Sequence, residues 1–206
     1  MKNNQLDTWE GKFGKDYTDR NVIEWRERLD AFKEVLSGLP IQSILEVGCN
    51  RGHNLLSLTE LLPADSQVVG IEPNQYAREI ARAASAKIGV LEGNAYDLPF
   101  KDGYFDVVFT AGVLIHISPS NLQTAISEIY RVSKRYILAI EYFSEEEEIV
   151  NYRGHTDLLW KRNFLKIYQQ AFDDLKLIRN GYWGDEKGFF RSHWWLFEKV
   201  SGSKAV

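Results

Sequence analysis

The sequence has a single cysteine, Cys49, and no run of apolar residues approaching the roughly 18 that a membrane-spanning helix needs. One cysteine excludes an intrachain disulfide and a thiolate cluster, so we expect no metal site. An excess of basic charge is also missing, because 25 Lys and Arg stand against 29 Asp and Glu. A protein that holds a nucleic-acid backbone usually carries a basic field. With no apolar signal segment at the start, these absences predict a cytoplasmic protein without nucleic-acid or membrane partners.

The chain has 206 residues, of which 44% are hydrophobic and 26% charged, and this is ordinary for one globular domain. Strand and helix patterns alternate along its middle. The expected strands are residues 43–47, 67–71, 88–91, 105–110 and 136–140, and the expected helices are residues 23–36, 54–62, 75–86 and 121–132. Repeated strand–helix units predict parallel strands covered by helices on both faces.

Residues 174–180 and 193–200 add two more expected strands, and the aromatic-rich stretch between them favours a long hairpin. A hairpin reverses the chain, so one strand must run antiparallel to its neighbours. The predicted fold class is therefore α/β, with a Rossmann-like, seven-stranded and mostly parallel sheet. Helices cover both faces, and an antiparallel strand lies at or near the edge.

A glycine-containing loop, Leu45-Glu46-Val47-Gly48-Cys49-Asn50-Arg51-Gly52-His53-Asn54, lies between the first strand and its helix. Glycines let the backbone turn tightly and approach a ligand closely. Glu72 ends the second strand, 20 residues after Gly52, where a carboxylate can accept two hydrogen bonds from a ribose diol. Loop and acid together indicate an adenosine-containing cofactor, with a purely structural turn as the alternative.

The pattern of this loop, E-x-G-x-N-x-G, differs from the G-x-G-x-x-G of dinucleotide sites. It resembles motif I of the class I S-adenosylmethionine-dependent methyltransferases, which usually reads E/D-x-G-x-G-x-G. Asn50 stands in place of the middle glycine, and Asn tolerates a positive φ better than most residues. The resemblance implies that Glu46 reaches the methionine ammonium of the cofactor. A buried structural acid that holds loop amides is the alternative for Glu46.

Three further segments resemble motifs of the same family in the same order. Residues 69–74 (VGIEPN) resemble motif II, which implies Glu72 and Pro73 at the ribose. Residues 92–100 (EGNAYDLPF) resemble the motif at the adenine, with Asn94 in place of its acid and Ala95 and Tyr96 beside it. Residues 105–117 resemble the fourth-strand motif, which implies that the methionine part lies over Thr110, Ala111 and Gly112. The resemblance covers about residues 40–141. It implies a methyltransferase with S-adenosylmethionine as cofactor and S-adenosylhomocysteine as product.

The N-terminal segment carries Trp9, Phe13 and Tyr17 at four-residue spacing, which would align them on one face of a helix. One interpretation is apolar packing onto the core. The other is a lid over the cofactor, because the faces of Trp9 and Tyr17 would attract its cationic sulfonium. Arg20 suits a carboxylate of the cofactor or of the acceptor.

The segment after the fifth strand begins at the carboxyl edge of the sheet, where ligands bind in open α/β folds. It mixes cations with aromatic rings, which would suit a small anionic acceptor. The candidate substrate-binding residues are Tyr152, Arg153, His155, Trp160, Lys161 and Arg162. The alternative is a helix that packs through Leu159 and Phe164 and leaves Lys and Arg exposed.

Both flanks resemble the small methyltransferases associated with pseudaminic acid biosynthesis. The shared patterns are W-x-G-x-F-G-x-x-Y-x-x-R-N from Trp9 and Y-R-G-H-x-D-x-L-x-K-R-x-F from Tyr152. The resemblance implies a nonulosonic sugar acid, its nucleotide-activated form or a precursor as acceptor. A hydroxyl or ammonium acceptor must lose a proton, so a general base helps. The candidates are His116, His155 and Tyr142.

These interpretations predict one domain over residues 1–206. It comprises a helical lid (1–38), a cofactor-binding core (39–141) and an acceptor-site flank with closing strands (142–206). The alternatives are a non-catalytic S-adenosylmethionine-binding protein, a nucleotide-dependent oxidoreductase, and a methyltransferase for another small molecule or a macromolecule. The acidic balance favours a small molecule. We interpret Cys49 as a small buried filler of its loop and Asp106 as a structural acid near the fourth strand.

Overall fold

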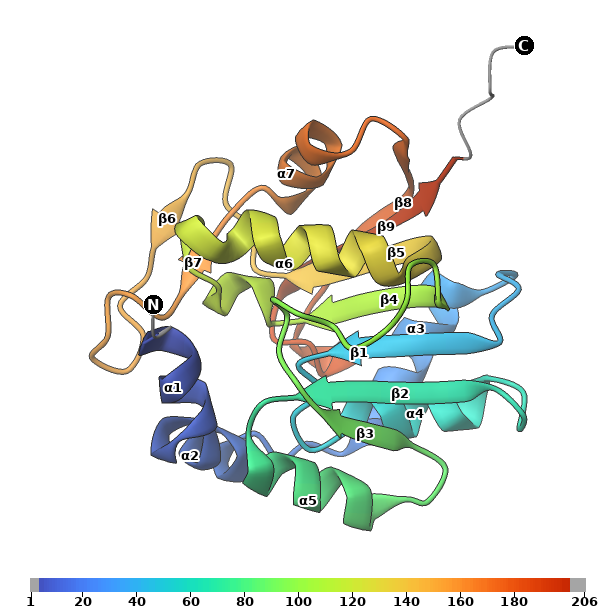
Figure 1. Ribbon diagram of the computed structural model, residues 1–206, viewed down its shortest axis with the longest axis horizontal. Helices are drawn as coiled ribbons and strands as arrows, with labels where there is room; N and C mark the ends of the chain where they lie inside the picture. Colours follow the sequence, from blue (N-terminus) through green and yellow to red (C-terminus); the bar gives the residue numbers. More distant parts are fainter. Residues whose placement is uncertain (1–3, 201–206) are drawn as a thin grey trace.

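The computed structural model describes residues 4–200, which are built around a seven-stranded sheet (Figure 1). The strand order is β3-β2-β1-β4-β5-β9-β8. The strands are β1 (Ser43–Val47), β2 (Gln67–Glu72), β3 (Gly89–Glu92), β4 (Phe105–Ala111), β5 (Ser133–Glu141), β8 (Leu175–Trp183) and β9 (Ser192–Lys199). The strands from β1 to β5 pair in parallel, whereas β9 runs antiparallel to both β5 and β8. The predicted fold class is confirmed.

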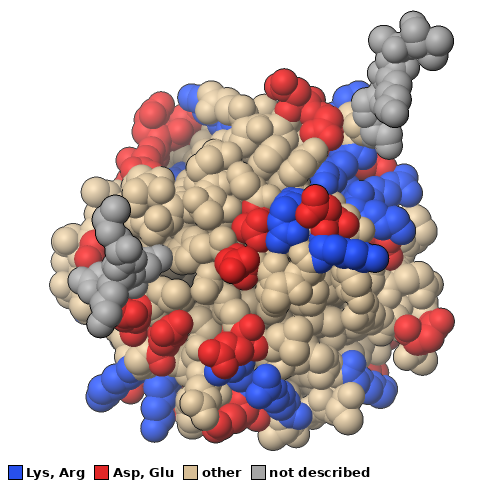
Figure 2. Space-filling model, in the orientation of Figure 1, with Lys and Arg blue, Asp and Glu red and all other residues tan. Residues whose placement is uncertain are grey.

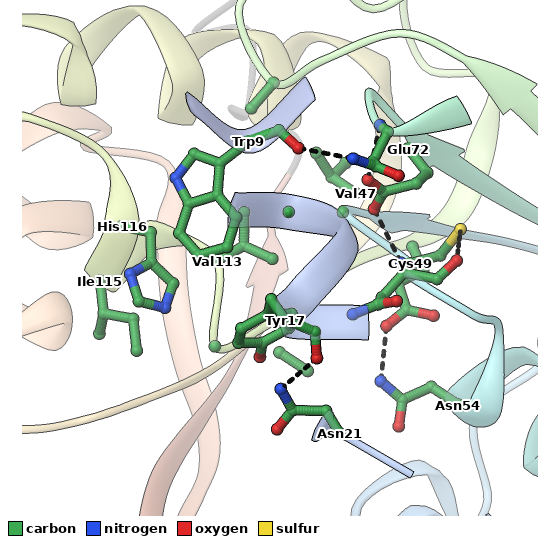
Figure 3. A pocket seen from close by; sticks show the side chains of 18 of the residues that line it. Trp9, Tyr17, Asn21, Val47, Cys49, Asn54, Glu72, Val113, Ile115 and His116 are labelled. Atoms are coloured by element: carbon green, nitrogen blue, oxygen red, sulfur yellow. Dashed lines mark hydrogen bonds between the residues drawn. The ribbon is translucent and has the colours of Figure 1, made fainter. Parts of the chain in front are cut away.

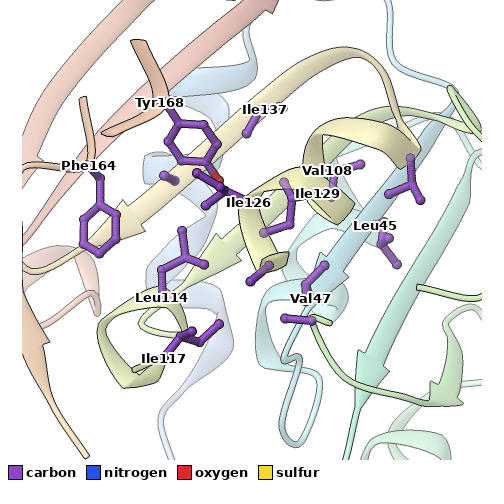
Figure 4. Packing of buried hydrophobic residues seen from close by; sticks show 14 of the residues in the cluster. Leu45, Val47, Val108, Leu114, Ile117, Ile126, Ile129, Ile137, Phe164 and Tyr168 are labelled. Atoms are coloured by element: carbon purple, nitrogen blue, oxygen red, sulfur yellow. The ribbon is translucent and has the colours of Figure 1, made fainter. Parts of the chain in front are cut away.

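Helices cover both faces of this sheet. α3 (Leu29–Leu36) and α4 (His53–Leu61) bury apolar side chains on one face, and α6 (Pro119–Val132) and α7 (Phe164–Ala171) do so on the other. Figure 4 shows Ile126 and Ile129 of α6 and Phe164 and Tyr168 of α7 in the cluster on the second face. Consecutive strand residues serve opposite faces, since Ile44 joins the first cluster and Leu45 the second. α5 (Gln75–Ala84) connects β2 to β3.

The N-terminal segment forms two helices rather than the single one that its spacing predicts. α1 (Asn4–Glu10) and α2 (Lys12–Arg20) are separated at Gly11, whose backbone is extended. Trp9 lies in α1 and Tyr17 in α2, yet the indole still meets the Phe13 and Tyr17 rings edge-on, at centroid distances of 5.2 and 5.4 Å. The shared aromatic face therefore arises from packing between two helices.

The segment after β5 also differs from the alternative helix through Leu159 and Phe164. A two-stranded hairpin of β6 (Glu148–Ile149) and β7 (Trp160–Lys161) comes first. α7 begins only at Phe164, because the side chain of Asn163 accepts a hydrogen bond from the Lys166 amide and caps the helix there.

Three short 3-10 turns, η1 (Trp25–Arg28), η2 (Leu114–His116) and η3 (Asp185–Lys187), complete the described elements. Asp106 has the structural role expected of it, since its carboxylate accepts hydrogen bonds from the amides of Gln42 and Ser43. None of the helices within residues 4–200 has the length and apolar character needed to cross a membrane.

Candidate active site

A pocket of about 370 Å³ opens at the carboxyl ends of β1, β2 and β4, under α1 and α2 (Figure 3). Strand ends converge here because the parallel strands share one direction. Of the predicted cofactor residues, the following line this pocket: Trp9, Tyr17, Glu46, Gly48, Asn50, Glu72, Pro73, Asn94, Ala95, Tyr96, Ala111 and Gly112. Gly52, Thr110 and Arg20 do not line it.

The loop after β1 turns through three residues with positive φ, which are Gly48 (78°), Asn50 (47°) and Gly52 (79°). Asn50 thus adopts the backbone conformation of the glycine that it replaces. Gly52 serves packing instead of the pocket, because an added Cβ would lie 3.2 Å from Ile88. Cys49 is buried, and burial raises the pKa of its thiol well above the ordinary value. This thiol is therefore a filler of the loop rather than a nucleophile.

Glu72 connects the ends of two strands through its carboxylate. One oxygen accepts a hydrogen bond from the Asn74 amide and the other from the Asn50 amide, each at 2.8 Å. Burial raises the pKa of Glu72 to about 6. A carboxylate offers about four acceptor positions, so the two amides leave capacity for a ligand hydroxyl pair.

Glu46 lies at the end of β1 in a chain of polar contacts that reaches the N-terminal segment. Its Oε1 accepts from the side chain of Asn54, whose Oδ1 accepts from Arg28 at 2.6 Å. The other oxygen, Oε2, is buried without a hydrogen-bond partner among residues 4–200. Burial raises the pKa of Glu46 to about 8. Glu46 holds no loop amides in this arrangement.

Arg28 lines the pocket, whereas the sequence analysis predicted that Arg20 would do so. Arg20 is exposed on α2, with its guanidinium 5.9 Å from the Phe13 ring, whereas Arg28 lines the pocket. Arg28 Nε and Nη2 both donate to the carbonyl of Gly188, before β9. No spacing in the sequence indicates these contacts, because the partners of Arg28 are 26 and 160 residues away.

Asn74 fastens the two N-terminal helices to the sheet. Its Nδ2 donates to the carbonyl oxygens of Trp9, Glu10 and Gly11 at 2.9, 3.0 and 3.2 Å, while its Oδ1 accepts from the Ala77 amide and caps α5. Gly14 makes this fit possible, because an added Cβ would lie 1.8 Å from the Trp9 oxygen. Trp9 and Tyr17 of these helices line the pocket, and we refer to residues 4–20 as the lid.

His116 lies at the other end of the pocket, in the turn after β4. The carboxylate of Glu141 fixes this turn by accepting from the amides of Val113, Leu114 and Ile115. His116 Nδ1 lies 2.5 Å from the Leu158 carbonyl oxygen, and since a carbonyl only accepts, Nδ1 carries the proton and Nε2 is the basic nitrogen. Burial lowers the pKa of His116 to about 4.

Aromatic rings surround His116. Its imidazole lies 4.6 Å from the Trp9 ring, 5.3 Å from the Tyr152 ring and 6.4 Å from the Tyr17 ring, measured between centroids. Tyr142 also lines the pocket, at the end of β5. Two of the three predicted catalytic residues, His116 and Tyr142, are therefore brought to the pocket.

The third, His155, is exposed outside the pocket, with its ring against Phe13 at 5.5 Å. Among the predicted substrate-binding residues only Tyr152 lines the pocket. Arg153 is exposed in a tight turn with a φ of 53°.

The three residues from Trp160 to Arg162 serve the hairpin rather than the pocket. Trp160 is buried in β7, and Lys161 pairs with Glu148 across the two strands at 3.4 Å. The buried Arg162 donates to Glu147 at 2.7 Å and to the Leu114 carbonyl at 3.0 Å. Arg162 therefore braces η2, the turn that carries His116. Arg162 does not line the pocket, so the structure does not support the prediction that it contacts the substrate.

Comparison with known proteins shows which class of protein this chain is similar to. Residues 45–136 match the family described as a methyltransferase domain, and this range runs from β1 into β5. The match and the strand order together show that residues 45–136 are similar to a methyltransferase domain.

More particularly, the chain is 36% identical over 131 residues to the demethylmenaquinone methyltransferase of Lactococcus lactis, covering 58% of this chain and 50% of that protein. The aligned part thus spans about half the length of the relative. The solved structure of magnesium protoporphyrin IX methyltransferase from Synechocystis, with bound S-adenosylhomocysteine, has a TM-score of 0.71 at 15% identity, covering 95% and 98% of the two chains. At this identity the likeness shows the fold.

Proposed function

We propose that this protein is an S-adenosylmethionine-dependent methyltransferase that acts on a small molecule. The observation that carries the proposal is the pocket itself, in which motif-matched residues from three strand ends meet under the lid. The buried, unpartnered Oε2 of Glu46 is an acceptor for the ammonium of the cofactor. We assign Glu72 to its ribose hydroxyls, because the two amides it accepts from leave acceptor positions on its carboxylate. Above Gly112 an added Cβ would meet no atom within 4 Å, so the floor leaves room for its methionine part.

When bound, S-adenosylmethionine supplies an electrophilic methyl group on a positively charged sulfur. The work left to the protein is to align an acceptor with that group and to exclude water, and such alignment is worth up to roughly 7–11 kcal/mol. The lid excludes water by closing the pocket with Trp9 and Tyr17. His116 Nε2 is unprotonated at neutral pH and can take a proton from a hydroxyl or N–H acceptor.

The size of the pocket and the mixed charge of the molecular surface favour a small acceptor. On the face shown in Figure 2, basic side chains lie among acidic ones and form no continuous positive surface. That the acceptor is a nonulosonic sugar acid stays a prediction, because the two methyltransferases reported above are named for other substrates. Of the basic residues expected to bind its carboxylate, none lines the pocket.

Calorimetric titration of the purified protein with S-adenosylmethionine, S-adenosylhomocysteine and NAD⁺ tests the cofactor. We expect micromolar binding of the first two and none of the third. A Gln75→Ala variant, changed at an exposed position beside the pocket, is the matched control. If neither adenosyl compound binds, the proposed function is wrong, and binding of NAD⁺ instead would support the oxidoreductase alternative.

A further inference from the structure

The end of the pocket around His116 differs in chemistry from the end around Glu72. Its walls are rings and aliphatic side chains, namely Trp9, Tyr17, Ile115, Tyr142 and Tyr152, which all line the pocket. We call this group of five residues and His116 the aromatic chamber. The aromatic chamber lies at the carboxyl ends of β4 and β5, whereas Glu72, the proposed ribose contact, ends β2. With the cofactor's ribose at Glu72, the chamber is the part of the pocket left for the acceptor.

The charged side chains that line the pocket, Arg28, Glu46, Arg51 and Glu72, all lie outside the aromatic chamber. Arg28 donates to Gly188 and Asn54, and Nη1 of Arg51 donates to the Thr18 carbonyl. With S-adenosylhomocysteine bound, whose sulfur is neutral, an anion buried beside Tyr142 and His116 would have no cationic partner in the chamber, and its burial would cost several kcal/mol. The chamber therefore disfavours a carboxylate or phosphate on the part of the acceptor that enters it.

Besides the three tyrosine hydroxyls, two polar groups of the chamber can serve a neutral ligand. His116 Nε2 is an acceptor, because Nδ1 holds the proton. Trp9 Nε1 is a buried donor with no partner among residues 4–200. One base and one donor among several ring faces form a suitable site for a flat molecule that carries a hydroxyl group.

Resting on the proposed methyltransferase function, we propose that the acceptor is an uncharged aromatic hydroxyl compound, methylated on oxygen. The ring of the acceptor packs against Tyr152 and Trp9, and its hydroxyl points to His116. His116 Nε2 takes the hydroxyl proton as the oxygen–methyl bond forms, and the electron pair of the broken sulfur–carbon bond stays on sulfur. No oxidant or reductant is needed.

A pair of probes tests the class directly. The protein saturated with S-adenosylhomocysteine is titrated with 2-naphthol and with 6-hydroxy-2-naphthoate, which differ only in the added carboxylate. We expect 2-naphthol to bind at least tenfold more tightly than the naphthoate. Tyr152→Ala should weaken 2-naphthol binding at least fivefold and Tyr152→Phe should not, whereas Tyr182→Ala, at an exposed ring on β8, is the matched control.

Equal or tighter binding of the naphthoate would overturn the proposal in favour of an anionic acceptor. Binding of S-adenosylhomocysteine without either naphthalene probe would also overturn it, while leaving the methyltransferase function in place. Absence of S-adenosylhomocysteine binding would instead remove the function on which the proposal rests. An unchanged 2-naphthol affinity in Tyr152→Ala would show that the ring contact is not part of the site.

Discussion

Asn74 both caps α5 and binds the lid, and the substitution Asn74→Asp separates these two roles. The aspartate keeps an oxygen for the Ala77 amide, so the cap of α5 survives. It loses the Nδ2 donor, and it places a carboxylate oxygen against the carbonyls of Trp9, Glu10 and Gly11. The cap is therefore kept while the attachment of the lid is lost, whereas Asn74→Ala would remove both. The new carboxylate also adds a negative charge near Glu72, because Asn74 lines the pocket.

The expected magnitude follows from the bonds lost. An amide has two N–H donors, each contributing about 0.5–1.5 kcal/mol net, so undocking of the lid becomes easier by about 1–3 kcal/mol. Since Trp9 and Tyr17 line the pocket only while the lid is docked, this loss appears in cofactor affinity. At 1.4 kcal/mol per factor of ten, we expect S-adenosylhomocysteine to bind roughly 5- to 150-fold more weakly.

Calorimetry measures the predicted loss of S-adenosylhomocysteine affinity, and amide hydrogen exchange measures the predicted undocking of the lid. Exchange of residues 4–20 should rise in Asn74→Asp, while exchange of the sheet stays as in the unmodified protein. Gln75→Ala, one residue along the same turn, should change neither. Unchanged exchange and unchanged affinity in Asn74→Asp would refute the inference that Asn74 holds the lid closed.

Three further perturbations follow from the site. Glu72→Ala should weaken S-adenosylhomocysteine binding by about tenfold or more in calorimetry, because the ribose loses its acceptor and the amides of Asn50 and Asn74 lose theirs; an unchanged affinity would place the ribose elsewhere. The raised pKa values of Glu46 (about 8) and Glu141 (about 7) mean that the folded state binds more protons than the unfolded state, so the free energy of unfolding should fall as pH rises. The fall should be visible from pH 7 to 8.5, where His53 and His116 are neutral in the folded state and mostly neutral in the unfolded state, and each carboxyl contributes at most about 2 kcal/mol. Urea titrations of Glu46→Gln should show a flatter dependence than the unmodified protein, and an equally steep one would contradict the assignment. Arg162→Ala should lower the free energy of unfolding by about 2–4 kcal/mol in urea and leave S-adenosylhomocysteine affinity unchanged, since Arg162 braces η2 from outside the pocket. The control is Lys161→Ala, and a loss of affinity at unchanged stability would return Arg162 to the binding site.

The sheet was predictable because its signals are local. β1 has the bounds expected from its apolar run, and Gly48, Pro73 and Gly112 directly follow the ends of β1, β2 and β4. The loop after β1 was predictable for the same reason, because it directly joins β1 to α4 and both of these elements have local signals. Even the substitution at Asn50 left a readable signal, because its φ of 47° is one that asparagine tolerates.

Contacts between distant segments could not be predicted in the same way. Arg20 and Arg28 are both basic residues of the N-terminal segment, and only the packing of η1 against α4 and Gly188 decides which of them reaches the pocket. Arg162 likewise looks like an exposed cation in the sequence. Its burial depends on a carboxylate at Glu147 and a carbonyl at Leu114, partners that no periodicity reveals.

The contact between Gly14 and Asn74 has a consequence for evolution. The two positions are 60 residues apart in the chain, yet an added Cβ at position 14 would lie 2.9 Å from Asn74 Nδ2 as well as against the Trp9 carbonyl. A larger residue at position 14 thus removes the surface on which the amide acts, so relatives that keep the asparagine contact must keep the glycine. Glycine and asparagine at these positions should be inherited together, and the pair marks relatives that close their pocket with the same lid.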